Sequence, residues 1–224
     1  MIDTVILDVD GTLVDSNYHH ALAWSRAFRR HGHDVELWRI HRAIGMGGDK
    51  LVAHVAGDDV EQSEGDALRE DWTREFDGLI GEVRPFAGSR PLLESVKERG
   101  LHLVLASSGQ PKHVQTFLDL VGGRSLADAW TTSDDVEESK PAADLLAVAL
   151  EKGGGRRGVM VGDATWDAEA AVNGGLPAIG LLTGGFAEAE LRRAGAVEVY
   201  AGPSELRSAL TDGLLDGLLD GLGD

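Results

Sequence analysis

Short apolar segments alternate with longer amphipathic segments along most of the chain. The segments 4–9 (TVILDV), 101–106, 158–161 and 178–182 have the length of strands, are rich in apolar residues and are bounded by Gly, Ser, Asp or Pro. Such runs suit strands that are buried on both faces of a parallel sheet. The patterns between them predict helices over 88–99, 111–120, 142–151, 166–173 and 188–194. Because strands and helices alternate, the pattern predicts an α/β fold.

The segment from about Asn17 to Arg84 interrupts this alternation. It contains no strand-like run, and we expect a helical insertion over 16–84 within a core formed by 1–15 and 85–211. Ser16 or Asn17 offers an N-cap where the insertion begins, and Pro85 follows where it ends. The insertion either moves at these junctions or packs rigidly on the sheet. Its large apolar residues recur at spacings that suit a helical core: Trp24, Phe28, Leu37, Trp38, Leu68, Trp72, Phe76 and Leu79.

The C-terminal segment 212–224 is a low-complexity repeat, DGLLDGLLDGLGD. Its leucines would line one side of a helix, but a glycine in each turn costs about 1 kcal/mol relative to alanine. We therefore expect a frayed tail.

Composition and charge narrow the class of protein. The chain has 224 residues, enough for a full domain and a smaller one, and its 21 Lys and Arg against 38 Asp and Glu give a formal net charge of −17. This charge disfavours nucleic acid and acidic membrane surfaces as partners. The absence of cysteine excludes disulfides, thiolate metal sites and a cysteine nucleophile. With an acid near the start and no apolar run of about 18 residues, the sequence predicts a soluble, cytoplasmic protein.

Two acids follow the first predicted strand, in Asp8-Val9-Asp10-Gly11-Thr12. Ligands of open α/β sheets bind beyond the carboxyl ends of the strands. Side chains alternate along a strand, so Asp8 and Asp10 start on one face. They can act as nucleophile and general acid/base, or share a divalent cation. The alternative is that Asp10 and Gly11 form only a turn and Asp8 only a cap.

A second buried segment also ends in an acid, Asp163, and Asp167 lies one turn further on if Trp166 opens a helix. Acids at the carboxyl ends of two parallel strands repel one another in a low-dielectric cleft unless a cation lies between them. Mg²⁺ suits such a site because it takes carboxylate oxygens and keeps waters that a substrate can displace.

Two further segments can bind an anion. Ser107-Ser108-Gly109 follows the strand-like run 101–106, and its hydroxyl and N–H groups can cradle phosphate oxygens. Lys140 precedes a helix that starts at a proline, where its ammonium can meet both a phosphate and the nucleophilic acid. Each segment alone is a weak indication of an anion site. The order and positions of the four segments along the chain are more informative.

These motifs together resemble those of the haloacid dehalogenase superfamily of aspartate-nucleophile phosphatases and phosphomutases. DVDGT at 8–12 is similar to the first motif of that family, Ser107 to the second, Lys140 to the third and GDATWD at 162–167 to the fourth. The resemblance covers about 4–200. It implies a Rossmann-like core with a parallel sheet and a small helical cap inserted after the first motif, which agrees with the strand-free segment.

The resemblance also implies roles for single residues. Asp8 would attack phosphorus and form an aspartyl-phosphate, and Asp10 would protonate the leaving oxygen and then deprotonate water. Mg²⁺ would bind the Asp8 carboxylate, the Asp10 carbonyl and the Asp163 carboxylate, with Asp167 in support. Ser107 and Lys140 would neutralise the transferring phosphoryl group. The remaining substrate-binding candidates are Gly11, Thr12, Ser108, Gly109, His20 and Lys50.

The implied activity is hydrolysis of a small phosphorylated metabolite. An acid at Asp10 argues against dehalogenation, which has no leaving oxygen to protonate. The segment 15–24 resembles the cap entry of β-phosphoglucomutase-like members, in which a histidine at the place of His20 helps the mutase cycle. Against a mutase, the loop 45–50 (GMGGDK) lacks the phosphate-binding arginine of that branch, and 162–167 has the GDxxxD form. A phosphatase is therefore favoured over a mutase, a non-catalytic binding module remains a third class, and the oligomeric state is open.

Overall fold

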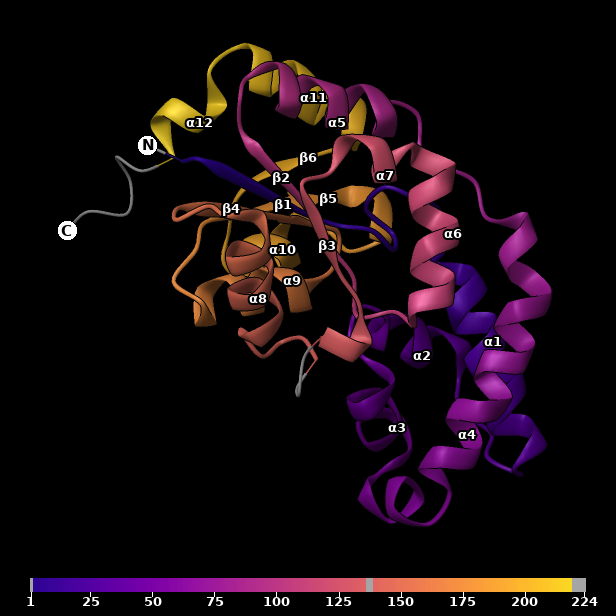
Figure 1. Cartoon of the computed structure of the whole chain (residues 1–224). Coiled ribbons are helices and arrows are strands. Elements are labelled where there is room, and N and C mark those ends of the chain that lie inside the picture. The colour runs from indigo at the N-terminus through magenta and orange to yellow at the C-terminus, as the bar shows by residue number, and fades with distance from the viewer. Residues whose placement is uncertain (1, 136–138, 219–224) are drawn as a thin grey trace.

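The computed structural model describes residues 2–135 and 139–218. Within them, six parallel strands form one sheet at the centre of the larger lobe, with helices on both faces (Figure 1). The strand order is β3-β2-β1-β4-β5-β6, so the first strand of the chain lies inside the sheet. The strands are β1 (Thr4–Asp8), β2 (His102–Ala106), β3 (Ala129–Thr131), β4 (Gly158–Gly162), β5 (Ala178–Leu181) and β6 (Ala196–Tyr200). The predicted α/β fold with a parallel sheet is confirmed.

The helices after the insertion divide between the two faces of the sheet. Figure 1 shows α5 and α11 above the sheet and α8, α9 and α10 below it, with α6 and α7 beside the β3 edge. Their bounds are α5 (Ser89–Glu98), α6 (Pro111–Val121), α7 (Gly123–Leu126), α8 (Asp144–Gly153), α9 (Thr165–Asn173), α10 (Glu188–Ala194) and α11 (Pro203–Thr211). Short 3₁₀ helices occur at Ser133–Asp135 (η2) and Leu182–Gly184 (η3).

Alternate residues of the central strands enter two separate apolar cores. Val5 and Leu7 of β1 belong to the larger core, whereas Ile6 between them belongs to the smaller one. Val159 and Met160 of β4 divide in the same way. Because successive side chains point to opposite faces, a strand covered on both faces must be apolar throughout. This explains why β1, β2 and β4 appear in the sequence as continuous apolar runs.

The two edge strands, β3 and β6, were not expected from the sequence. β3 has three residues, of which only Thr131 is buried, and most of β6 is partly or fully exposed. Edge strands pair on one side and need less apolar surface, so they lack the apolar run that marks central strands.

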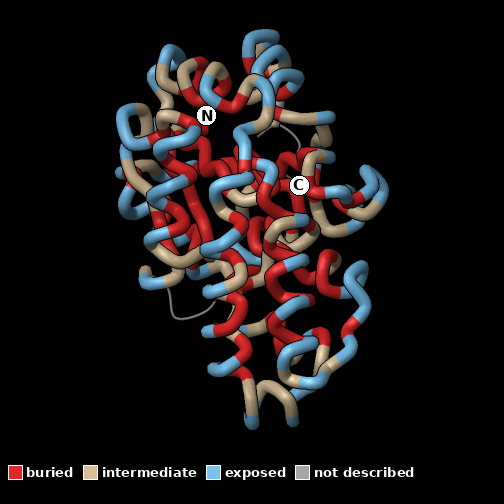
Figure 2. Tube along the Cα trace, turned by 90° about the vertical axis from the view of Figure 1, so that its right-hand side faces the viewer, coloured by how far each residue is buried: buried red, intermediate tan, exposed pale blue. Residues whose placement is uncertain are grey.

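The segment after the first strand is helical, as predicted. It forms α1 (Asn17–Arg30), α2 (Leu37–Ala43), α3 (Gly48–Ala56), α4 (Asp58–Leu79) and the 3₁₀ helix η1 (Ile80–Glu82), and α1–α4 lie together below the carboxyl ends of the strands in Figure 1. Figure 2 shows buried residues continuing from the sheet into this smaller lobe. Its interior includes Trp24 and Trp72, whose rings stack with centroids 5.3 Å apart.

Two apolar residues that we expected in this core are on the surface. Leu37 is 45% exposed and Trp38 is 67% exposed. They lie in the first turn of α2, a helix of seven residues that buries Ile40, His41 and Ala43 instead. The expectation was wrong for these two residues because apolar type alone does not say which face of a short helix packs inward.

The C-terminal repeat is partly ordered against the core. Leu214–Gly217 forms a short helix, α12, where we expected a frayed tail, and Leu214, Leu215 and Leu218 pack partly buried against the larger core. Residues 219–224 lie outside the described part of the chain. None of the helices in the described part is both long and apolar enough to span a bilayer.

Candidate active site

The carboxyl ends of three neighbouring strands bring the predicted site residues together. β1 ends at Asp8, which pairs in register with Ala106 at the end of β2, and β4 lies on the other side of β1. Ser107 and Asp163 directly follow β2 and β4. Asp167 lies in the first turn of α9, as the sequence predicted if a helix began near Trp166.

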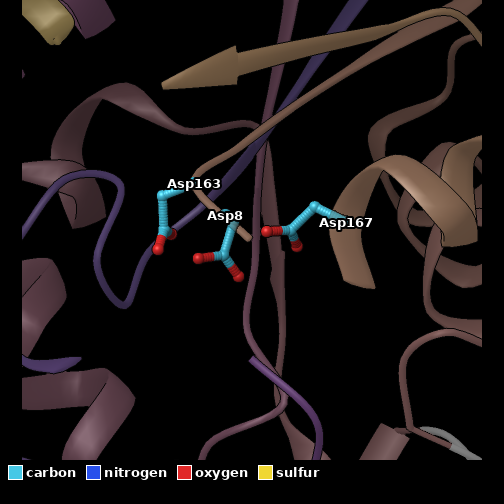
Figure 3. A group of neighbouring side chains, drawn as sticks. All are labelled: Asp8, Asp163 and Asp167. Carbon is cyan, nitrogen blue, oxygen red and sulfur yellow. The ribbon is translucent and has the colours of Figure 1, made fainter. Parts of the chain in front are cut away.

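The carboxylates of Asp8, Asp163 and Asp167 form a buried cluster. One oxygen from each lies within 4.8 Å of the others. Figure 3 shows Asp163 and Asp167 on either side of Asp8, with the carboxylate of Asp167 directed toward that of Asp8. Water has almost no access to these side chains, so their mutual repulsion is little screened.

Lys140 contacts two members of this cluster. Its Nζ donates hydrogen bonds to Asp8 Oδ1 at 2.5 Å and to Asp167 Oδ1 at 2.7 Å. The residue is only 1% exposed. Burial by itself lowers the pKa of the Lys140 ammonium, but the attraction of Asp167 and Asp8 outweighs it and raises that pKa above its usual value. Lys140 is therefore held charged beside the acids.

The negative charge of the acid cluster exceeds the positive charge that neighbouring side chains supply. Burial is the largest cause of the raised pKa of Asp8, and the neighbouring carboxylates Asp167 and Asp163 raise it further. Burial, followed by the charge of Asp167, raises the pKa of Asp163 to about 7. Three carboxylates face a single ammonium among the described contacts. This set of hard oxygen ligands with excess negative charge fits a divalent cation such as Mg²⁺.

Two side chains hold the carboxylate of Asp163. Thr12 Oγ1 donates to Asp163 Oδ1 at 2.7 Å, and Asn17 Nδ2 donates to Asp163 Oδ2 at 2.8 Å. Gly11 leaves the room for this arrangement, because a Cβ there would lie 2.4 Å from Asp163 Oδ2, and its φ is +72°. The Asn17 Oδ1 atom is buried and has no hydrogen-bond partner in the described part of the chain. Asn17 therefore presents an unused oxygen beside the acid cluster.

Asp10 has different neighbours from Asp8. Its Oδ1 accepts hydrogen bonds from His20 Nε2 and Ser16 Oγ, both at 2.8 Å, and its Oδ2 accepts one from Ser107 Oγ at 3.1 Å. Burial raises the pKa of Asp10, but the hydrogen bond and charge of His20, together with the two hydroxyl groups, outweigh burial and lower it. The pKa values of the two acids of the first motif, Asp8 and Asp10, are thus shifted in opposite directions.

Ser16 and Asn17 were noted in the sequence only as N-cap candidates. The structure places Ser16 at the N-cap position of α1, with no side-chain capping bond. The side chains of both residues hold site acids instead, Asp10 and Asp163 respectively. The sequence signal for helix capping and that for a polar contact across the fold are the same residue types, so the pattern could not separate them.

A pocket opens beside these acids between the sheet and the helical insertion. Asp8, Asp10, Lys140 and His20 line it, as do the predicted substrate-binding residues Ser108 and Gly109. The insertion contributes Trp24, Ile44, Gly45, Met46, Gly47, Gly48, Leu51 and Trp72. Gly11, Thr12, Ser107 and Lys50 are not among the lining residues. Thr12 contacts Asp163 instead, and Ser107 contacts Asp10.

The insertion contacts the sheet domain next to Lys140. The Gly47 N–H donates to Ser139 Oγ at 3.1 Å, Ser139 Oγ donates to Asp49 Oδ1 at 2.6 Å, and Lys50 Nζ donates to the Ser139 carbonyl oxygen at 2.9 Å. The segment 45–50, which the sequence singled out and which includes the first turn of α3, therefore holds the residue that precedes Lys140.

Three further hydrogen bonds join the insertion to the sheet domain. Gln110 Nε2 donates to Thr73 Oγ1 at 2.8 Å, and Arg42 Nη2 donates to Glu190 Oε1 at 2.5 Å. The Trp166 indole N–H donates to the Arg42 carbonyl oxygen at 3.3 Å. In this structure the insertion is therefore packed against the sheet domain beside the acid cluster.

Comparison with known proteins identifies the family. The family model described as haloacid dehalogenase-like hydrolase matches residues 2–175. The chain belongs to the haloacid dehalogenase-like hydrolases. Among hydrolases of solved structure, one from Pseudomonas syringae superposes with a TM-score of 0.88 at 31% identity, covering 94% of this chain and 98% of the other. The predicted family resemblance is therefore confirmed.

Curated relatives of this haloacid dehalogenase-like hydrolase include phosphatases. A validoxylamine A 7'-phosphate phosphatase of Streptomyces hygroscopicus subsp. limoneus is 25% identical over 203 residues, which are 84% of this chain and 90% of that protein. A phosphoglycolate phosphatase of Agrobacterium fabrum is 26% identical over 191 residues, 80% of each chain.

Proposed function

We propose that this haloacid dehalogenase-like hydrolase is a Mg²⁺-dependent phosphatase that hydrolyses a small-molecule phosphate monoester through an aspartyl-phosphate at Asp8. Phosphatases of similar sequence support a phosphoric monoester hydrolase. One observation carries the finer proposal: Asp8 lines a pocket, accepts a hydrogen bond from Lys140, and has the carboxylates of Asp163 and Asp167 beside it. This arrangement combines a nucleophile, a fixed cation and a site for a metal.

Asp8 is the proposed nucleophile. Its carboxylate oxygen attacks phosphorus in line, and the bond from phosphorus to the leaving oxygen breaks. Lys140 holds Asp8 Oδ1 through its hydrogen bond and so fixes the orientation of the carboxylate. Bound Mg²⁺ would supply positive charge to the phosphoryl oxygens, with Asp8, Asp163 and Asp167 as its side-chain ligands and the carbonyl of Asp10 as a further one.

Asp10 is the proposed general acid and base. It protonates the leaving oxygen in the first step and takes a proton from water in the second, when water attacks the aspartyl-phosphate. The lowered pKa of Asp10 favours its ionised form in the free protein, so the first step needs a proton from a neighbour. His20 Nε2, 2.8 Å from Asp10 Oδ1, is the group that would deliver it.

The same contact is the observation that favours a second candidate, a β-phosphoglucomutase-like mutase. His20 occupies the cap-entry position at which that branch carries a functional histidine, and it contacts the acid/base. A mutase must also bind the non-transferred end of a phosphorylated sugar, for which Lys50 was the sequence candidate. Lys50 donates to the main chain at Ser139 and does not line the pocket, which supports the phosphatase instead.

Two further assignments belong to the proposal. Ser108 and Gly109 would contact the phosphoryl group, since both line the pocket. The helical insertion would act as a cap domain with bounds near 16 and 84, because it supplies one wall of the pocket and reaches the sheet domain through Ser139.

The test is phosphate release from a broad panel of phosphate monoesters with and without Mg²⁺, measured for the wild type and Asp8→Asn. A matched control is Asp15→Asn, which removes the charge of an exposed aspartate near the same strand. We expect turnover that needs Mg²⁺, survives Asp15→Asn and disappears in Asp8→Asn. Activity retained by Asp8→Asn would remove Asp8 as the nucleophile. Conversion of β-glucose 1-phosphate into its 6-phosphate isomer without phosphate release would identify a mutase.

A further inference from the structure

A second pocket adjoins the catalytic one and is larger. Its volume is about 240 Å³, against about 70 Å³ for the pocket at Asp8 and Lys140. Gly48, Trp72 and Ser108 line both pockets, so the second begins where the first ends. If the phosphoryl group lies at Asp8, the rest of the substrate extends past these shared residues. The larger pocket is thus placed to receive the leaving group.

Most of the described residues that line this second pocket are uncharged. Of the described lining residues, two are charged, Asp49 and Arg69, and six are uncharged: Gly48, Trp72, Ser108, Gln110, Ser133 and Ser139. The Ser108 hydroxyl oxygen is buried and has no hydrogen-bond partner in the described part of the chain. The hydroxyl and amide side chains in this lining can donate and accept hydrogen bonds, so they suit a leaving group that itself carries hydroxyl groups.

The guanidinium of Arg69 is already occupied. Its Nη1 donates to both carboxylate oxygens of Glu61, at 2.9 and 3.0 Å, and to the Gly48 carbonyl oxygen at 3.0 Å. Its Nη2 donates to Asp66 Oδ1 at 2.8 Å. Asp66 is exposed, so the Glu61 contact is the stronger of the two ion pairs. An anionic substrate would have to displace Glu61 to use Arg69.

Asp49 adds an unbalanced negative charge to the same wall. Its carboxylate accepts hydrogen bonds from Ser139 Oγ at 2.6 Å and from the Ser139 N–H at 3.4 Å. No cation pairs with Asp49 in the part of the chain that the structure describes. A carboxylate or second phosphate on the leaving group would meet this charge in a partly buried pocket, where like charges repel strongly.

We propose that the second pocket selects an uncharged, hydroxyl-bearing leaving group and rejects a second anionic group, with Asp49 and the Glu61–Arg69 pair as the determinants. This inference rests on the proposed phosphatase function, because it assigns the non-transferred half of the same substrate.

The experiment compares substrates that differ only in that feature. One pair is glycerol 1-phosphate and 3-phosphoglycerate, and the other is 2-hydroxyethyl phosphate and 2-phosphoglycolate; in each, a hydroxymethyl group replaces a carboxylate. We expect kcat/KM for the hydroxyl member to exceed that for the carboxylate member by at least about tenfold. Equal values, or a preference for the carboxylates, would overturn the inference.

Two variants test whether Asp49 and Glu61 cause the preference for hydroxyl over carboxylate substrates. Asp49→Asn removes the unbalanced charge, and Glu61→Gln releases the guanidinium of Arg69 for an anion. Each should lower the hydroxyl-to-carboxylate ratio by about threefold or more. Glu70→Gln is the matched control, since Glu70 is an exposed acid on the same helix, α4, that does not line the pocket. A ratio that Glu61→Gln and Asp49→Asn leave unchanged would remove these residues as determinants.

Binding measurements distinguish a failure of the proposed phosphatase function from a failure of the proposed selectivity of the second pocket. Hydrolysis of p-nitrophenyl phosphate tests the phosphatase function without a demand on hydroxyl recognition. If no ester is hydrolysed, the proposed function fails, and calorimetric titration of Asp8→Asn with the same pairs still decides the inference. Tighter binding of the hydroxyl members by about tenfold supports it, and equal or weaker binding contradicts it.

Discussion

His20 Nε2 lies 2.8 Å from Asp10 Oδ1, and the two residues come from different parts of the fold. Asp10 follows the first strand of the sheet, whereas His20 lies in the first helix of the insertion. The His20 ring also stacks on Phe76 of α4, with centroids 3.9 Å apart. The packing of the insertion therefore sets the position of a histidine on the proposed acid/base.

His20 should control the protonation of Asp10. His20→Ala removes a hydrogen bond that lowers the pKa of Asp10, so that pKa should rise, and the limb of the kcat/KM pH profile that reports Asp10 should move to higher pH. His20→Gln keeps a hydrogen-bond donor but cannot deliver a proton, and it should lower kcat for poor leaving groups by about tenfold or more. Pre-steady-state and steady-state rates against pH test both variants.

His19 provides the control for that comparison, since it is the adjacent histidine and makes no contact with Asp10 in the described contacts. His19→Ala should leave the pH profile where it is. An identical shift in both variants would show that the effect comes from general loosening of α1.

Asp10→Asn should separate substrates by leaving group. Loss of the general acid should slow alkyl phosphate monoesters by about 10²–10⁴-fold. p-Nitrophenyl phosphate should lose less, because its leaving group departs without protonation. The measurement is kcat/KM on both substrate types, with Asp15→Asn as the charge-matched control. Equal losses on both types would contradict an acid role for Asp10.

Mg²⁺ should be required for activity and should stabilise the protein. We expect EDTA to abolish turnover and added Mg²⁺ to restore it, and we expect Mg²⁺ to raise the melting temperature of the wild type. Asp163→Asn should remove most of that rise. A chelated protein with full activity would contradict the magnesium proposal.

The stability of the metal-free protein should depend on pH through Asp163. The pKa of this residue is raised from 3.8 to about 7, so the folded state keeps a proton that the unfolded state has released. The corresponding stability is present below about pH 4 and is lost as pH rises toward about 7. The stabilisation by Mg²⁺ should therefore be larger at pH 8 than at pH 5, as melting temperatures can show. A larger effect at pH 5 would contradict the assignment of Asp163.

Two aromatic residues of the insertion should differ in their effect on folding. Phe76→Ala should reduce the free energy of unfolding by about 3–5 kcal/mol, because the Phe76 side chain is fully buried among other rings. Trp38→Ala should change it by no more than about 0.5 kcal/mol, because Trp38 is exposed. Urea denaturation measures both, and similar losses would place Trp38 in a packed environment.

The central part of the fold was predictable because burial on both faces imposes a strong pattern. β1, β2 and β4 are continuous apolar runs, and each ends next to a site residue. β3 and β6 lie at the edges of the sheet and have no such pattern. The position of Asp167 was also predictable, since helical spacing fixes it relative to Asp163 once α9 begins at Thr165.

Contacts between distant segments were not predictable in the same way. Thr12 and Asn17 hold Asp163, about 150 residues away in the sequence, and neither spacing nor residue type indicates this pairing. The same is true of Lys50, a substrate-binding candidate by its sequence context, which donates a hydrogen bond to the carbonyl oxygen of Ser139.

Local sequence was enough to predict the alternation of strands and helices, the helical insertion, the family motifs and the acids that follow β1 and β4. Local periodicity and strand-end chemistry carry this information because each depends on neighbours along the chain. The folded arrangement was needed to see which side chains the acids contact and that the pKa values of Asp8 and Asp10 shift in opposite directions. It also revealed the second pocket, which extends past Trp72. Burial and electrostatic interaction depend on distances between segments, and folding sets those distances.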